Sequence, residues 1–178
     1  MKAKALLLLI FLFSTAVFSQ TKFTIGGSLG GGSFSGNSSS VTGFTSSLYL
    51  EADIPLFAEV YPRASFVFTR DFDALLPNSN KPYYPYLMGA SIKGVTYQFF
   101  ESKIFLEEGV GLLALNDRSL IDTNVWDYGV LLSLSVGYDL RNFDLNGFKI
   151  GAGAEYGITF FNTLPKYSSI HAFVQFTL

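Results

Sequence analysis

Residues 127–139 read DYGVLLSLSVGYD, and apolar side chains take nearly every second position of this stretch. Residues 148–160, FKIGAGAEYGITF, repeat the same alternation. Because successive side chains of a strand point to opposite faces, both stretches are predicted β-strands with one apolar face and one small, polar or charged face. Strands of globular proteins usually run to about five or six residues. These longer runs instead match the length that crosses a bilayer.

The N-terminus has the composition of an export signal. Lys2 and Lys4 precede an entirely apolar run over residues 5–13, and Val17 and Ser19 occupy the −3 and −1 positions of a cleavage site. This order of charged, apolar and small residues predicts a cleaved secretory signal over residues 1–19. The mature chain is then a single domain over residues 20–178, in which no linker or change of composition marks a boundary.

Composition limits the fold further. The chain has no cysteine, so an exported protein of this sequence has no disulfide framework. Its formal net charge of −2 provides no basic surface, which argues against a nucleic-acid partner. Aromatic residues make up 17% of the chain, yet no apolar run of helix length follows the signal. A chain that meets lipid without such a helix must pair all its backbone groups in a closed barrel.

The same alternation marks eight strands along the chain. The connections after the odd-numbered strands are mostly longer than those after the even-numbered ones, as in outer-membrane barrels with short periplasmic turns and longer extracellular loops. The sequence therefore predicts an all-β, eight-stranded antiparallel up-and-down transmembrane barrel. The strands are expected at residues 23–32, 44–54, 58–69, 86–98, 104–115, 127–139, 148–160 and 170–178.

The whole mature chain resembles the small eight-stranded outer-membrane barrels typified by OmpA and OmpX, particularly their relatives from Bacteroidetes-type bacteria. Four segments carry the resemblance: Phe18-Ser19-Gln20, residues 106–111 (LEEGVG), residues 151–154 (GAGA) and the alternating C-terminal strand. The resemblance implies an outer-membrane location in a Gram-negative bacterium. It also implies lipid and lipopolysaccharide as surroundings and the barrel-insertion machinery as a partner during biogenesis.

The inward face collects most of the charged residues of the predicted strands. An eight-stranded barrel is only wide enough inside for side chains to fill it, and isolated buried charges are very unfavourable. We therefore expect a plug of salt bridges, with a gated ion path as the alternative. Glu107 and Glu108 are adjacent and cannot both face inward without a bulge, so Glu107 is expected inside and Glu108 near the rim. The predicted interior set is Glu51, Asp53, Glu59, Arg63, Lys93, Glu107, Asp127, Lys149, Glu155 and His171.

A catalytic alternative rests on the single histidine. His171 is predicted to face inward, close to Ser168 and Ser169 and beside Glu155 on the neighbouring strand, and a serine, a histidine and a carboxylate are the groups of acyl transfer. Outer-membrane lipid A deacylases are similar in architecture, but they place histidine and serine two apart on one strand face. Phe173 stands at that position here. The expected protein is therefore not an enzyme, and no metal or cofactor site is predicted.

The loops are the expected contact surface. The longest, residues 70–85, carries apolar side chains that suggest contact with lipopolysaccharide or an unknown surface protein. The expected function is a structural or surface-interaction role of an integral outer-membrane barrel. The alternatives are a narrow channel, a lipid-modifying enzyme, and a soluble periplasmic barrel that binds an apolar ligand with residues 130–138 inside. The loop contact candidates are Phe72, Leu75, Leu76, Tyr83 and Tyr84.

Overall fold

A computed structural model describes residues 22–54, 59–76, 80–100, 102–141 and 146–178. The predicted signal over residues 1–19 and the predicted turn at Pro55 and Leu56 lie outside these residues. In the part described, no helix is long and apolar enough to cross a membrane.

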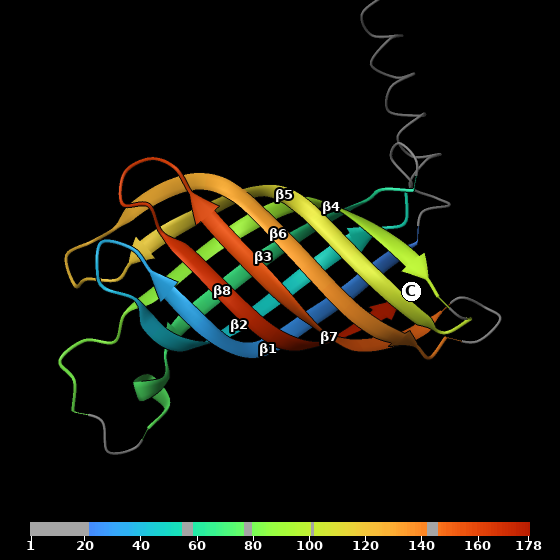
Figure 1. The fold of residues 1–178 in the computed structure, drawn as a ribbon, viewed down its shortest axis with the longest axis horizontal. Coiled ribbons are helices and arrows are strands. Elements are labelled where there is room, and N and C mark those ends of the chain that lie inside the picture. The colour runs from blue at the N-terminus through green and yellow to red at the C-terminus, as the bar shows by residue number, and fades with distance from the viewer. Residues whose placement is uncertain (1–21, 55–58, 77–79, 101, 142–145) are drawn as a thin grey trace, which may run out of the picture.

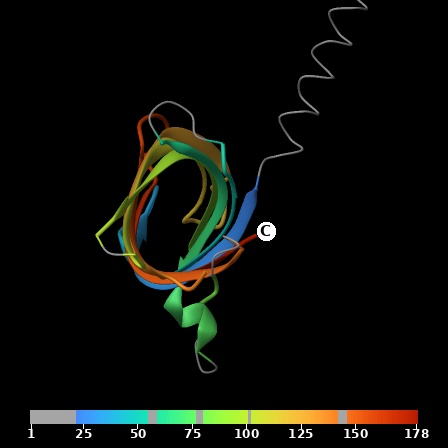
Figure 2. The same cartoon turned by 90° about the vertical axis from the view of Figure 1, so that its right-hand side faces the viewer.

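The chain forms eight antiparallel strands that close on themselves, each paired with its sequence neighbours and β1 with β8. The tilted strands enclose an elongated barrel (Figures 1 and 2). This confirms the predicted up-and-down architecture. The strands are β1 (Phe23–Ser35), β2 (Val41–Ala52), β3 (Tyr61–Asp71), β4 (Tyr86–Phe99), β5 (Ile104–Arg118), β6 (Val125–Asp139), β7 (Gly147–Thr159) and β8 (Lys166–Thr177).

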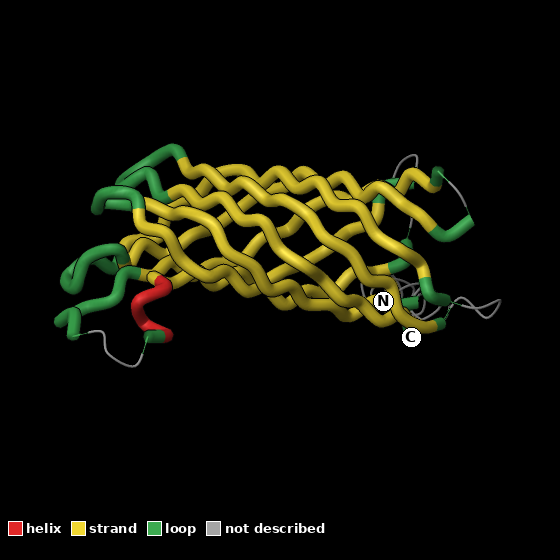
Figure 3. The backbone as a smooth tube through the Cα atoms, turned by 60° about the horizontal axis from the view of Figure 1, so that its bottom comes forward, coloured by secondary structure: helices red, strands yellow, loops and turns green. Residues whose placement is uncertain are grey.

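The two ends of the barrel differ in their connections. We call one the loop end, which carries residues 36–40, 72–85, 119–124 and 160–165, and the other the turn end, which carries Lys22, the first described residue, and the C-terminus (Figure 3). The excess length at the loop end lies in the connection 72–85, which includes the short 3₁₀ helix η1 (Phe72–Leu75). The other three connections there are no longer than turn 53–60.

Apolar side chains cover the outside of the barrel. Leu29, Leu112 and Ile170 are 70, 73 and 75% exposed, whereas the inward Arg63 and Glu107 are each only 3% exposed. The predicted assignment of faces is confirmed along the strands. The alternative of a soluble barrel with residues 130–138 turned inward is wrong, because Leu132, Leu134 and Val136 are each 52% exposed.

Several strands extend further toward the loop end than the sequence predicted. β1 continues to Ser35 and β8 begins at Lys166, whereas composition indicated loops at 33–40 and 161–168. The Ser, Gly and Asn content of these segments favours turns, but pairing overrides this local preference. Phe34 pairs with Tyr167 across the β1–β8 seam, and both side chains are 1% exposed. Burying these two rings provides a reason for the longer strands.

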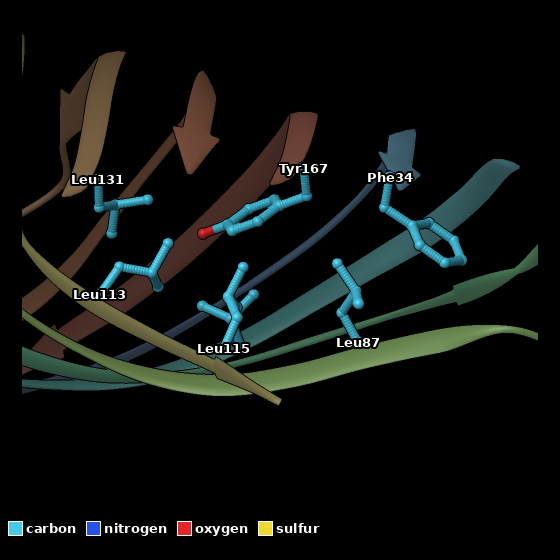
Figure 4. Packing of buried hydrophobic residues seen from close by; sticks show 7 residues of the cluster. Phe34, Leu87, Leu113, Leu115, Leu131 and Tyr167 are labelled. Atoms are coloured by element: carbon cyan, nitrogen blue, oxygen red, sulfur yellow. The ribbon is translucent and has the colours of Figure 1, made fainter. Parts of the chain in front are cut away.

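An apolar plug fills the loop-end half of the interior. Its members come from six strands and converge on the barrel axis (Figure 4). Leu87, Leu115 and Leu131 are completely buried. The interior is thus apolar in its loop-end half and polar between this plug and the turn end. The plug consists of Phe34, Val67, Leu87, Leu113, Leu115, Leu131 and Tyr167.

Gly157 leaves the space that this plug occupies. A Cβ atom there would collide with the ring of Tyr167 and lie 2.6 Å from Leu113 Cδ2. We expect Gly157→Val to lower the free energy of unfolding by about 1–3 kcal/mol through overpacking. Urea unfolding in detergent micelles measures the effect, with Ala154→Val on the exposed face of the same strand as the control. Equal stabilities of the two variants would contradict the prediction.

Candidate functional site

Arg63 is the centre of the buried polar network. Its Nη2 donates to Glu51 Oε2 at 2.6 Å, and its Nη1 donates to Glu107 Oε1 at 2.7 Å. Tyr97 accepts from Arg63 Nη2 at 2.8 Å and donates to Glu51 Oε1 at 2.9 Å. The Arg63 guanidinium also lies 4.4 Å from the centre of the Tyr49 ring. One cation from β3 therefore joins carboxylates on β2 and β5, across the barrel interior.

Lys93 forms a second buried pair. Its Nζ donates to Glu155 Oε2 at 2.9 Å and to Ser133 Oγ at 3.1 Å. The other oxygen of Glu155 accepts from Tyr167 Oη at 2.6 Å. Since Tyr167 belongs to the apolar plug, this bond connects the polar network to it. The expected plug of salt bridges thus exists for Arg63 and Lys93.

Lys149 is held differently from these two cations. Its Nζ lies 4.1 Å from the ring centre of Tyr97 and 5.3 Å from that of Phe105, and the residue is 5% exposed. A cation over aromatic faces is stabilised by their negative potential, increasingly so away from water. The side chain of Lys149 therefore contacts the network through the Tyr97 ring.

Very little space remains between these side chains. A cavity of about 20 Å³ lies among Arg63, Lys93, Glu107 and His171. That volume holds about one water molecule. The network crosses the interior and joins side chains of β2, β3, β4, β5 and β7.

Asp53 and Glu59 do not belong to this network, contrary to the sequence prediction. Asp53 is exposed beyond the last residue of β2, where its backbone N–H donates to Lys22 O at 2.8 Å. Glu59 is also exposed, and its φ of 68° places it in a turn before β3 begins at Tyr61. Extending the alternation past the strand ends produced both errors.

His171 faces inward as predicted, but its surroundings do not form a catalytic triad. Its Nδ1 lies 3.4 Å from Ser169 Oγ. Both oxygens of Glu155 are bonded to Lys93 and Tyr167. Ser168 lies on the outer face, where its Oγ is 3.0 Å from Ser33 Oγ. Without a carboxylate to orient the histidine, this arrangement lacks the relay that acyl transfer requires.

Asp127 faces inward and is completely buried, but it acts at the loop end, apart from the other charges. Its Oδ1 accepts from Phe161 N at 3.0 Å, and its Oδ2 accepts from Thr163 N and Leu164 N, both at 3.1 Å. Three backbone amides of loop 160–165 thus converge on one carboxylate. The Leu164 φ of 51° shows how sharply the chain turns around it.

Removing this carboxylate should release the loop. We expect Asp127→Ala to increase amide hydrogen exchange at residues 161–164 at least tenfold, because buried N–H groups lose a charged acceptor. Hydrogen-exchange mass spectrometry checks this, with peptides from β4 as the internal reference. Unchanged protection of loop 160–165 would show that other contacts hold it.

The predicted contact residues of loop 72–85 divide into two groups. Leu75 and Leu76 are 62 and 58% exposed, as a contact surface requires. Phe72 is 39% exposed but also packs beside Phe44, with ring centres 6.4 Å apart, and Tyr83 Oη donates to Arg118 O at 2.7 Å. The Tyr84 ring lies 5.8 Å from the Arg70 guanidinium. Further exposed side chains at the loop end were not predicted as contact residues, namely Leu120, Ile121, Phe161 and Leu164.

Lys81 ties this loop to the barrel. Its Nζ donates to Asp71 Oδ2 at 3.0 Å and pairs with Asp73. The hydrogen bonds from Lys81 to Asp73 and Asp71 raise the pKa of this lysine above its ordinary value. The stabilisation of the loop is therefore fully present below the ordinary lysine pKa of about 10.4, and it disappears as pH rises through the higher pKa.

We expect protease cleavage in loop 72–85 to accelerate only at strongly alkaline pH. Lys81→Met should show the accelerated cleavage already at neutral pH and remove the alkaline step. Limited proteolysis across pH 7–12 with an alkali-stable protease measures both, with cleavage of an unfolded substrate as the pH control. A pH profile that Lys81→Met leaves unchanged would contradict the role of this ion pair.

Glu108 occupies a position that the sequence analysis did not predict. The β4–β5 and β5–β6 registers continue without a bulge, so Glu107 and Glu108 point to opposite faces. Glu108 is exposed on the outer face, in register with Thr96 and Leu134, and it is not at the rim. Among the described residues, none forms a hydrogen bond or ion pair with its carboxylate. Glu108 comes four positions after Ile104, the first residue of β5, which places it roughly 10 Å along the barrel axis from the turn end of that strand.

Comparison with known proteins establishes the fold alone. No family model matches the chain, and no curated protein matches it by sequence. Among solved structures, Neisserial surface protein A is similar over 88% of this chain and 97% of its own, with a TM-score of 0.70 and 13% identity. Ail, the attachment invasion locus protein of Yersinia pestis, is similar over 88 and 98%, with a TM-score of 0.51 and 10% identity.

Proposed function

We propose that this protein is an integral barrel of a Gram-negative outer membrane that stabilises the envelope or contacts a surface partner through its loop end, without catalysis. The observation that carries this proposal is the distribution of side chains. Apolar residues cover most of the outside of the strands, and Arg63 and Lys93 are buried inside in ion pairs with carboxylates. In water this arrangement would expose a large apolar surface, whereas in a bilayer it satisfies both faces.

The filled interior supports a structural role over conduction. The apolar plug closes the loop-end half, and the Arg63 network occupies the middle with room for about one water molecule. A permeating ion would have to displace both. The narrow channel is therefore the less favoured function.

The fixed loop end supports a contact role. Asp127 holds loop 160–165, and Lys81 pairs with Asp71 and Asp73 next to η1. The exposed Leu75, Leu76 and Phe161 therefore lie close to residues that these bonds fix. Ordered apolar residues at a surface favour binding, since less conformational entropy is lost. The shared fold with a protein described as an attachment invasion locus protein agrees with this role. The surroundings would be lipid and lipopolysaccharide, with insertion machinery acting during biogenesis.

Fractionation tests the membrane location directly. We expect the expressed protein in the outer-membrane fraction, with faster gel migration before boiling than after it, because the closed barrel resists detergent until heated. A barrel that is soluble in water would instead appear in the periplasmic fraction. Recovery there without detergent would overturn the proposal.

A binding measurement tests the loop-end role separately. Membranes carrying the double variant Leu75→Ser/Leu76→Ser should retain the heat-modifiable barrel but bind lipopolysaccharide-bearing vesicles or cell surfaces more weakly than the unmodified protein. Leu29→Ser on the outer barrel wall is the control for a change outside the loops. Unchanged adhesion in the loop variant would remove these residues from the contact surface.

A further inference from the structure

Glu108 is a charged residue on the mostly apolar outer face of the barrel. The other charged residues on that face, Arg70, Arg118 and Lys166, lie at the loop ends of their strands, whereas Glu108 lies within the apolar band. Its outward neighbours along β5 are Leu106 and Val110. Charged side chains that face lipid destabilise a barrel according to their depth. A carboxylate at this position is therefore unfavourable unless a hydrogen-bond donor meets it, and none of the described residues donates to it.

Two potential hydrogen-bond donors lie beside this carboxylate. Thr96 is in register with Glu108, and Gln98 follows two residues later on the same face of β4. No hydrogen bond joins Glu108 to either residue within the molecule. The face therefore presents a strong acceptor next to a hydroxyl and an amide that can donate. Acceptor and donors side by side make this face self-complementary.

The shape of the wall permits a close approach here. A groove on the outer face reaches Glu108, where Gly94, Thr96 and Val110 line it, and continues from there over β6, β7, β8 and β1. Small residues let membrane-embedded backbones come near enough for van der Waals contact and hydrogen bonding. In a two-fold symmetric interface, each Glu108 would meet Thr96 and Gln98 of the other copy.

We propose that the outer face of β4 and β5 is the dimer interface of this protein, in which a second copy supplies the hydrogen-bond partners of Glu108. The inference rests on the membrane location proposed above. It adds a specific surface and a specific partner. The contact would be made within the membrane and would leave the loop ends free on both copies.

The absence of cysteine from the chain makes a direct test possible. Val110→Cys places one thiol beside Glu108, and Leu29→Cys places a thiol of similar exposure, 70 against 60%, on β1 as the matched control. Both variants are inserted into phosphatidylcholine vesicles and oxidised. We expect cross-linked dimer from Val110→Cys at least tenfold faster than from Leu29→Cys.

Substitution of Glu108 supplies the second measurement. In density-matched detergent, sedimentation should show dimerisation of Glu108→Leu at least tenfold weaker than that of the unmodified protein. Glu108→Gln, which keeps the hydrogen-bonding oxygen and adds a donor, should remain within about threefold. Heat-modifiable migration establishes that each variant is a folded barrel, and therefore separates a failed interface from a failed membrane location.

Two results would overturn the interface. One is equal cross-linking of Val110→Cys and Leu29→Cys in protein that migrates as a folded barrel. That result would mean that only lipid surrounds Glu108. The other is dimerisation of Glu108→Leu as strong as that of the unmodified protein. A barrel recovered only in the soluble fraction would refute the membrane location and the interface with it.

Discussion

Arg63→Met is expected to lower the free energy of unfolding by about 3–5 kcal/mol, because it leaves buried carboxylates without their cation. Glu51 and Glu107 are 5 and 3% exposed, and both are bonded to the Arg63 guanidinium. Methionine matches the length of the arginine stem, so the loss is chiefly one of charge and hydrogen bonds. Urea unfolding in lipid vesicles, followed by tryptophan fluorescence of Trp126, measures the change.

A compensating variant distinguishes this explanation from simple loss of packing. The triple substitution Glu51→Gln/Arg63→Met/Glu107→Gln removes the unpaired charges together with the cation and should recover most of the lost stability. Lys81→Met, which removes the ion pairs of an exposed lysine with Asp71 and Asp73, serves as the surface control, with a much smaller expected effect. An Arg63→Met barrel as stable as the Lys81→Met barrel would contradict the central role of Arg63.

Leu112→Arg is expected to lower the free energy of unfolding by about 2–4 kcal/mol in a bilayer, because it places a charge near the middle of the outer apolar band. Leu112 is 73% exposed on β5, so the new side chain meets no steric obstacle from the barrel itself. Ile121→Arg is the matched control, since Ile121 is 67% exposed in the loop 119–124. A surface change of that kind should stay within about 0.5 kcal/mol.

Equilibrium unfolding in phosphatidylcholine vesicles compares the two arginine variants. A large effect of Leu112→Arg beside a small effect of Ile121→Arg would identify lipid as the surroundings of the strands. Equal effects would mean that both positions face water, which would refute the proposed membrane location.

The faces of the strands could be predicted from the sequence because the two-residue period of a strand is a local property. Arg63, Lys93 and Glu155 all point inward as that period requires. Which carboxylate each cation binds depends on strand register, which the sequence pattern does not specify. The pairing of Arg63 with Glu51 and Glu107 therefore came only from the structure.

Errors arose where local signals conflict with long-range pairing. Asp53 and Glu59 followed the alternation but lie beyond the ends of β2 and β3. Phe34 stands in a segment with loop composition, yet its burial against the β8 residue Tyr167 extends the strand. Glu108 was assigned to the rim because two adjacent glutamates cannot both face inward without a bulge, whereas the regular pleat turns the second one outward on the barrel wall.

The seam between β1 and β8 has a consequence for the order of assembly. Thr24 pairs with Thr177, so this contact joins residues 153 positions apart and encloses almost the whole described chain in one loop. The entropy of closing a loop increases with its length, and contacts so distant in sequence slow folding. One edge of β1 therefore stays unpaired until β8 has been synthesised. Shielding that edge during the interval is a requirement that this topology imposes on the cell.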